Sequence, residues 1–327
     1  MRAIRLCVAG QAAGSGDAEA CLVMSVSARL RNEARDLLEL VLLPGIAALL
    51  PWRLCFRFFR WLCGKDFLYG ESCNEAMAQA DARGWVRGDP GEWLRTRRLV
   101  TLIDHADFYL ARTRSDRWMS RHLSVHGAWP DPSEPAILCT FHWGAGMWGL
   151  RHASSCGLHA HALVAAHTRE AFPGRSVRYW YYGQRMRAVA AALKRRPIEV
   201  SASPRPILQA LRDGEPVVAA VDVPSDQVAA SDTIDFLGQP ARVPRALLRV
   251  AVESKVPVTA FLTGIRLTDG QRTLHIHRLG RFDDLKALMI ESFALLQRAV
   301  ETEPAAWHFW EVAPRFFASV AEVESPR

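Results

Sequence analysis

Lysine is scarce in this chain, and so are the patterns that would identify a nucleic-acid-binding protein. Only four of the 41 basic residues are lysines, so arginine carries nearly all of the +7 net charge; the four are Lys65, Lys194, Lys255 and Lys286. A basic surface favours an acidic partner, such as phospholipid headgroups, an acidic carrier protein or nucleic acid. No zinc-finger, basic-zipper or aromatic RNA-binding signature is found, which argues against nucleic acid.

Paired cysteines and serine-hydrolase motifs are also missing. The seven cysteines are odd in number and include no C-x-x-C pair, which indicates reduced thiols facing a cytoplasm and no disulfide framework or zinc site. The absence of G-x-S-x-G disfavours a serine hydrolase. His159 and His161 fall on one face of an expected strand, but no acidic or cysteine ligand is spaced to complete a site. We expect no metal and no cofactor.

No apolar run is long enough to cross a membrane as a straight helix. The run from Leu37 to Trp52 has sixteen residues, is broken by Pro44, Gly45 and Pro51, and falls short of the roughly 20 that a span needs. Arginines interleaved with phenylalanine and tryptophan follow it up to residue 64. This pattern is typical of the membrane–water interface, and we predict a membrane-associating helical segment over 29–64. The alternative is a pair of amphipathic helices packed on the domain.

The remaining chain alternates between short apolar segments and helical patterns. Residues 1–28 are weakly patterned and resemble neither a signal peptide nor a core element, so we expect a flexible leader. In the region 65–327 we predict strands at 136–141, 161–166, 216–222, 256–262 and 273–279. Helices are predicted over 92–114, from 147 onwards, and over 179–196, 206–212, 243–255 and 283–303. The alternation predicts an α/β domain with a mixed central sheet flanked by helices.

The segment TFHWGAGMWGLR, residues 140–151, supports two different interpretations. Starting at Gly144 it is a G-x-G-x-x-G, the turn that binds the pyrophosphate of NAD(P) in an oxidoreductase. Against this, two residues separate the strand from the first glycine, and Met147 and Trp148 are bulky for such a turn.

Starting at His142, the same segment is a histidine at a strand end, held by a glycine bend. Imidazole is suited to general-base catalysis because its pKa lies near cytoplasmic pH. Gly144 and Gly146 would let substrate approach the backbone and expose N–H groups that stabilise an oxyanion.

Further blocks extend this second interpretation across the chain. They are LLPW, CTFHWGAG, VAAHTRE, YGQRMR, VVAAVDVP, DFLGQPARVPRALLRVA and the terminal WHFWEVAPRFF. In their order and spacing, from about Leu37 to Phe317, the sequence resembles the lipid A biosynthesis (lauroyl/myristoyl) acyltransferase family of the glycerolipid acyltransferase superfamily. The resemblance implies an enzyme at the cytoplasmic face of a bacterial inner membrane. It would move an acyl group from acyl carrier protein or coenzyme A to a hydroxyl of a lipid or glycolipid.

The chain departs from this family at one position of the motif. The family pattern H-x-x-x-x-D/E places an acid five residues after the histidine, where this chain has Met147. Methionine cannot orient an imidazole or stabilise its protonated form. A literal match, from His126 to Asp131, lies in a proline-rich connector and is interpreted as chance. Asp222, at the end of an expected strand, is the candidate for a supporting carboxylate, with a turn cap as the alternative. A catalytically silent lipid-binding relative is the second hypothesis.

The resemblance also implies a set of substrate contacts around His142. Arg169 and Arg185 would bind acceptor phosphate, and Met147 with the two glycines would line the site. An F-x-G-x-P turn would lie beside the acyl channel and be followed by a basic side chain; its residues are Phe236, Gly238, Pro240 and Arg242. Each of these predictions has a structural alternative, which is a solvated surface charge for each arginine and a hairpin corner for the turn.

Overall fold

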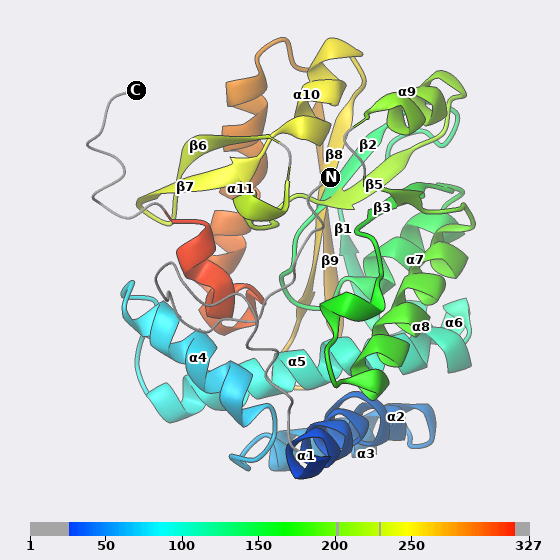
Figure 1. Cartoon of the computed structure of the whole chain (residues 1–327). Helices are drawn as coiled ribbons and strands as arrows, with labels where there is room; N and C mark the ends of the chain where they lie inside the picture. Colours follow the sequence, from blue (N-terminus) through cyan, green and yellow to red (C-terminus); the bar gives the residue numbers. More distant parts are fainter. Residues whose placement is uncertain (1–25, 201–202, 229, 318–327) are drawn as a thin grey trace.

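A mixed β-sheet forms the centre of the protein. The computed structural model describes residues 26–200, 203–228 and 230–317 (Figure 1). Within them the sheet has the order β1-β9-β8-β2-β5-β3-β4, with only β8 and β9 antiparallel to each other. Its strands are β1 Leu123–His126, β2 Ile137–Thr140, β3 His161–Val164, β4 Ile198–Glu199, β5 Val217–Ala220, β8 Val258–Ile265 and β9 Arg272–Gly280. The expected mixed sheet flanked by helices is confirmed.

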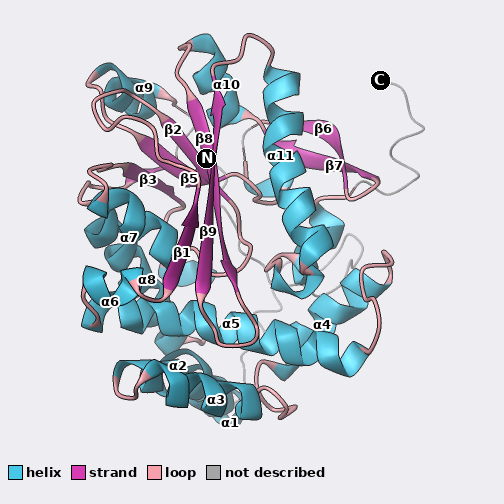
Figure 2. Ribbon diagram, turned by 180° about the vertical axis from the view of Figure 1, so that it is seen from behind, coloured by secondary structure: helices cyan, strands magenta, loops and turns pink. Residues whose placement is uncertain are grey.

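Helices cover both faces of this sheet. Figures 1 and 2 show α7 and α8 on one side, α11 on the other, and α5 crossing one end. The longer helices are α4 Gly70–Asp81, α5 Pro90–Thr113, α7 Met147–Ser155, α8 Ser176–Leu193, α9 Arg205–Arg212, α10 Ala246–Glu253 and α11 Leu285–Thr302, with the short α6 at Asp116–Ser120. Side-chain caps fix two of the starts: Asp89 accepts from the amides of Gly91 and Glu92 at α5, and Asp284 caps α11 in the same way.

The core follows the two-residue period of the strands. In β2, Ile137 and Cys139 face the core beneath α11, whereas Leu138 faces the core beneath α5 and α7. In β8, Ala260 faces the core beneath α11, and Phe261 faces the core beneath α5 and α7. A central strand that is buried on both faces has an almost wholly apolar sequence, and for this reason these strands were predictable from the sequence.

The N-terminal segment packs onto the domain as a set of short helices. They are α1 Val26–Asp36, a π-helical turn η1 Leu37–Leu42, α2 Leu43–Gly45, a 3₁₀ turn η2 Ile46–Ala48 and α3 Trp52–Leu62. Figures 1 and 2 show them beneath α5, on the side away from the sheet. The aromatic face of α3, including Trp52 and Phe59, joins the core formed by α5 and α7. The segment is therefore built as packed amphipathic helices, the alternative considered above. Most of the expected leader, residues 1–25, lies outside the described residues.

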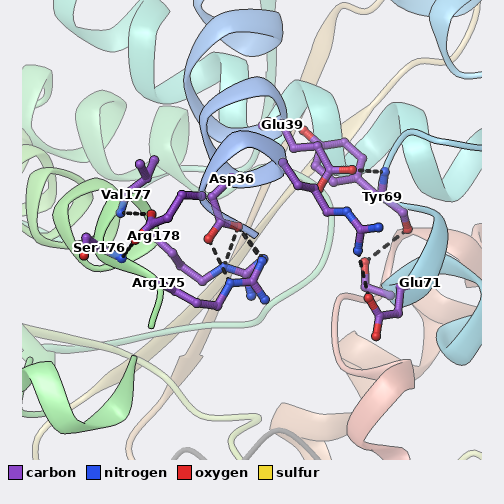
Figure 3. A network of polar contacts seen from close by, with 11 residues as sticks. Asp36, Glu39, Tyr69, Glu71, Arg175, Ser176, Val177 and Arg178 are labelled. Carbon is purple, nitrogen blue, oxygen red and sulfur yellow. Dashed lines mark hydrogen bonds and ion pairs between the residues drawn. The ribbon is translucent and has the colours of Figure 1, made fainter. Parts of the chain in front are cut away.

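Buried carboxylates join this segment to the domain (Figure 3). Asp36, which is fully buried, pairs with Arg175 at 2.6 Å and Arg178 at 3.1 Å. Glu39 accepts the backbone N–H of Tyr69 at 2.7 Å, and the Tyr69 hydroxyl donates to the Glu39 carbonyl at 2.7 Å. Because a buried charge is costly unless it is paired, these contacts define one position of the N-terminal helices on the domain.

A two-stranded hairpin, β6 Ser231–Phe236 and β7 Gln239–Pro244, stands beside the main sheet and next to α11. The turn contains Leu237 and Gly238, both with positive φ, which is the backbone of a two-residue hairpin turn. The F-x-G-x-P pattern is thus a hairpin corner. The sequence indicated a hairpin here only as the alternative interpretation of the turn, and the short β1 and β4 were not predicted.

Candidate active site

The strand register brings His142 and Asp222 together. Strands β2 and β5 are parallel neighbours, and Thr140 pairs with Ala220 at the last step of the ladder. His142 and Asp222 each lie two residues further along their strands, so they meet just beyond the carboxyl edge of the sheet. This edge is where open α/β sheets place their functional side chains.

The Asp222 carboxylate is wholly committed to hydrogen bonds. Oδ1 lies 2.9 Å from Nδ1 of His142, and the backbone N–H of His142 donates to both oxygens at 3.0 and 2.9 Å. The indole N–H of Trp307 donates to Oδ2 at 3.1 Å. Asp222 is fully buried, whereas 39% of the His142 side chain is exposed. The expected contact is therefore present, while the catalytic role of either residue stays a prediction.

The other ring nitrogen of His142 faces no protein partner in the part of the chain that is described. Nδ1 carries the proton when it donates to a carboxylate, so Nε2 is left with a lone pair. A partly exposed imidazole with this tautomer can accept a proton from a bound molecule. The opposite nitrogen, held by Asp222, would stabilise the resulting imidazolium.

The C-terminal loop forms a wall of this site. The amide of His308 donates to the His142 carbonyl at 2.8 Å, and Nε2 of His308 donates to the Gly144 carbonyl at 2.8 Å. The ring of Phe309 lies against His142, with 4.3 Å between the ring centroids. From the sequence, this loop was recognised only as the terminal block of the resemblance, and no role was predicted for His308 or Phe309.

Arg97, on α5, holds this loop from behind. Its buried guanidinium donates to the carbonyl of Trp307 at 2.7 Å and to that of His308 at 3.0 Å. Burial and the Arg97 charge lower the pKa of His308 to about 4. His308 is therefore neutral near pH 7 and acts here as a hydrogen-bond donor. Arg97 was not predicted, because nothing in the helical pattern of α5 distinguishes it from the arginines nearby.

The glycine bend differs from expectation in its hydrogen bonds. Gly144 has φ +70°, and its amide donates to Ala306 at 3.0 Å. The amide of Ala145 donates to the Thr263 carbonyl at 2.9 Å. These two N–H groups are therefore unavailable to an oxyanion, which corrects the expectation for Gly144. Gly146 and Met147 begin α7, where the first N–H groups of a helix have no partner within it.

Met147 does not line the site. Its side chain is buried in the core beneath α5, together with Trp148 and Leu138. The position that carries an acid in the resembled family is therefore an apolar core position here. The expectation of a substrate contact at Met147 was wrong, because the first turn of α7 directs this side chain inward.

The arginines that were expected to bind substrate have partners within the protein. Arg185 forms an ion pair with Asp104 of α5, at 2.8 Å. Burial acts to raise the pKa of Asp104, yet the Arg185 guanidinium brings it well below its usual range. Arg185 therefore links α8 to α5 through this ion pair, and we do not retain it as a substrate contact. Arg169 is exposed and donates to Ser176, and Arg242 donates to Ser231 on the hairpin.

The hairpin turn contributes to the site only indirectly. Phe236 is buried and packs edge-on against Trp307, with 5.6 Å between the ring centroids. Pro240 lines a hollow of about 210 Å³ between the hairpin and α11, whose lining does not include His142. Phe236 therefore supports Trp307, and Pro240 lies at a separate hollow, while their expected position beside an acyl channel stays a prediction.

The described residues contain no group of three or more histidine, cysteine or acidic side chains arranged to hold a metal ion. Within the same residues, no helix combines the length and the apolar character that a membrane crossing requires. Neither protein-family models nor curated proteins gave a match to this chain.

Proposed function

We propose that this protein is a membrane-associated O-acyltransferase that moves an acyl group from a thioester of acyl carrier protein or coenzyme A to a hydroxyl of a lipid or glycolipid. The observation that carries the proposal is the contact between His142 and Asp222. It supplies the carboxylate that the motif position, Met147, lacks. The proposal also rests on the resemblance in the order of sequence blocks.

In the proposed reaction, Nε2 of His142 takes the proton of the acceptor hydroxyl as its oxygen attacks the thioester carbonyl. Asp222 stabilises the imidazolium through Nδ1–H. The tetrahedral intermediate then collapses, the carbon–sulfur bond breaks, and the proton passes from His142 to the departing thiolate. The N–H groups at the start of α7, at Gly146 and Met147, are the nearest candidates in sequence for oxyanion donors.

A second function, NAD(P) binding by the glycine segment, has less support. In a dinucleotide-binding βαβ unit the two strands are neighbours in the sheet. Here β5 lies between β2 and β3, the strands before and after α7. The third glycine, Gly149, has a different explanation, because a Cβ there would lie 2.8 Å from the Phe261 ring. Close packing of α7 on β8 requires it.

Membrane association is proposed for the outer face of the N-terminal helices. Leu49 is 82% exposed and Trp61 is 61% exposed, and Leu54 is also open to solvent. Exposed arginines lie among them on α3, at Arg53, Arg57 and Arg60. Apolar side chains that insert among lipids, interleaved with cations that meet anionic headgroups, favour a bilayer surface over water.

The decisive experiment is an acyl-transfer assay with both classes of thioester donor, with lipid extracts as acceptors and products identified by mass spectrometry. General-base catalysis contributes about 10²–10⁴-fold, so His142→Ala should lower the turnover by that factor while the protein stays folded. His126→Ala is the matched control, because His126 begins the literal H-x-x-x-x-D string and lies on another strand. Wild-type turnover by His142→Ala, or no transfer from any thioester by the wild type, would overturn the proposal.

A further inference from the structure

Trp307 makes a contact that no expectation from the sequence assigned to it. Its indole N–H donates to Oδ2 of Asp222 at 3.1 Å, and both side chains are fully buried. The other oxygen of the same carboxylate, Oδ1, contacts Nδ1 of His142 at 2.9 Å. Indole, carboxylate and imidazole therefore form a continuous chain of three groups.

This geometry restricts the carboxylate to one orientation. Besides the indole, the backbone N–H of His142 lies between the two oxygens, so rotation of Asp222 would break at least one of these bonds. A buried acceptor that loses a donor is penalised by about 1–3 kcal/mol. Oδ1 is therefore held toward the imidazole by a donor placed behind it.

The indole itself is held firmly. The Trp310 ring packs edge-on against it, with 4.9 Å between the ring centroids. Phe236, on the β6–β7 hairpin, also packs edge-on, with 5.6 Å between the centroids. Arg97 fixes the backbone carbonyl of Trp307 at 2.7 Å. The donor is thus rigid before any substrate arrives, which is the requirement for a group that orients a base.

We propose that Trp307 is a positioning residue of the active site: its indole N–H orients Asp222, and Asp222 in turn keeps the proton of His142 on Nδ1. The kinetic part of this inference rests on the proposed function. The tautomer of His142 does not, since it is a property of the resting protein.

The test removes the indole N–H in two ways. Trp307→Phe replaces the indole with a smaller phenyl ring, whereas β-(3-benzothienyl)alanine at position 307 keeps the fused two-ring shape and has sulfur in place of the nitrogen. We expect the ¹⁵N spectrum of His142 to change from the Nδ1–H form toward a mixture of both tautomers. We expect kcat to fall about 10- to 100-fold, as is usual when an outer partner of a site is lost, with little change in KM. If the Trp307→Phe protein does not fold, the benzothienyl variant still provides the test, because it keeps the shape of the indole ring.

Trp52→Phe is the matched control, because its buried indole also donates to a backbone carbonyl, that of Asp269 at 3.2 Å, but lies in the core beneath α5 and α7 and contacts neither Asp222 nor Trp307. It should leave the tautomer unchanged. An unchanged His142 tautomer in both Trp307 variants would overturn the inference, as would an equal change in Trp52→Phe. If the wild type transfers no acyl group, the proposed function fails, yet the spectra still decide the role of Trp307.

Discussion

The carboxylate of Asp222 lies 2.9 Å from Nδ1 of His142, although 80 residues separate the two in sequence. The carboxylate that contacts the imidazole therefore follows the neighbouring strand, β5, and does not lie five residues further along the chain. A parallel register places any residue two positions beyond β5 beside the equivalent residue beyond β2. An acid there can serve the histidine without an acid at position 147.

Asp222→Asn tests this arrangement directly. The asparagine amide nitrogen can donate to Nδ1, which would move the ring proton to Nε2 and abolish its basic lone pair. In the Ser–His–Asp triad the same change costs about 10⁴-fold in kcat, and we expect a loss of 10²–10⁴-fold here. The measurement is kcat beside the ¹⁵N spectrum of His142. Undiminished transfer by a folded Asp222→Asn protein would show that the carboxylate has no part in catalysis.

Introducing at position 147 the acid of the resembled family should destabilise the protein. In Met147→Asp a carboxylate would be buried in the apolar core beside Trp148 and Leu138, and an unpaired buried charge costs about 3–5 kcal/mol. Urea denaturation should report this loss, whereas Met147→Leu should cost less than about 1.5 kcal/mol. A Met147→Asp protein with normal stability and faster acyl transfer would mean that the side chain at 147 faces the site after all.

Most of the sheet could be predicted from the sequence, because buried parallel strands such as 216–222 are apolar runs bounded by proline, glycine or charge. The helices after Pro90 and around 283–303 could be predicted from their caps and apolar periodicity. Strand β4 has only two residues, and β1 is an edge strand in which only Leu123 is buried, so neither forms an apolar run.

The site was predictable only as far as strand ends could be recognised. His142 and Asp222 stand directly after two apolar strands, so the meeting of the two could be inferred. Trp307 and His308 could not, because their position depends on how a loop more than 80 residues away from Asp222 folds back over β2. Met147 was misassigned because a motif position was taken as a site position, whereas the first turn of α7 points it into the core.

Two glycines in the same bend should differ sharply in their tolerance of alanine. Gly144 has φ +70°, and a Cβ there would lie 2.1 Å from the Thr263 carbonyl oxygen. Left-handed backbone alone costs a non-glycine residue about 1–2 kcal/mol, and the contact adds to this. Gly146 has φ −70° and open space around a Cβ. Thermal denaturation should show a fall of about 5 °C or more for Gly144→Ala and almost none for Gly146→Ala. Equal melting temperatures would contradict the described bend.

Buried histidines should make the protein sensitive to mild acid. Burial, together with nearby arginine, lowers the pKa of His105 to about 3 and that of His308 to about 4. In the unfolded chain both titrate near 6.5, so below that pH the unfolded state binds protons that the folded state does not. These groups cost no stability above pH 6.5, and the cost grows as pH falls toward 4.

The measurement is the free energy of unfolding in urea between pH 7.5 and 5, for the wild type and His308→Gln. Replacing one such histidine removes about one proton from the difference in binding between the unfolded and folded states. Below pH 6.5 the slope of the unfolding free energy against pH should therefore fall by about 1.4 kcal/mol per pH unit. Burial raises the pKa of Glu39 and Glu303, which acts in the opposite sense, so the difference between the two proteins is the quantity of interest. Identical slopes would show that His308 titrates normally in the fold.

Binding to anionic bilayers should depend on the outer face of α3 and not on basic side chains in general. Arg53 and Arg57 are exposed on α3, and Arg205 and Arg212 are exposed on α9, at the opposite end of the molecule in Figures 1 and 2. Each arginine near an anionic surface contributes about 1 kcal/mol. Arg53→Gln with Arg57→Gln should therefore weaken co-sedimentation with phosphatidylglycerol vesicles by roughly 10- to 30-fold at moderate salt. The Arg205→Gln, Arg212→Gln pair changes the charge equally and should bind as the wild type does. Equal losses of binding in the two double variants would indicate unspecific charge attraction. If the wild type does not bind the vesicles, the proposal that the protein associates with membranes is wrong.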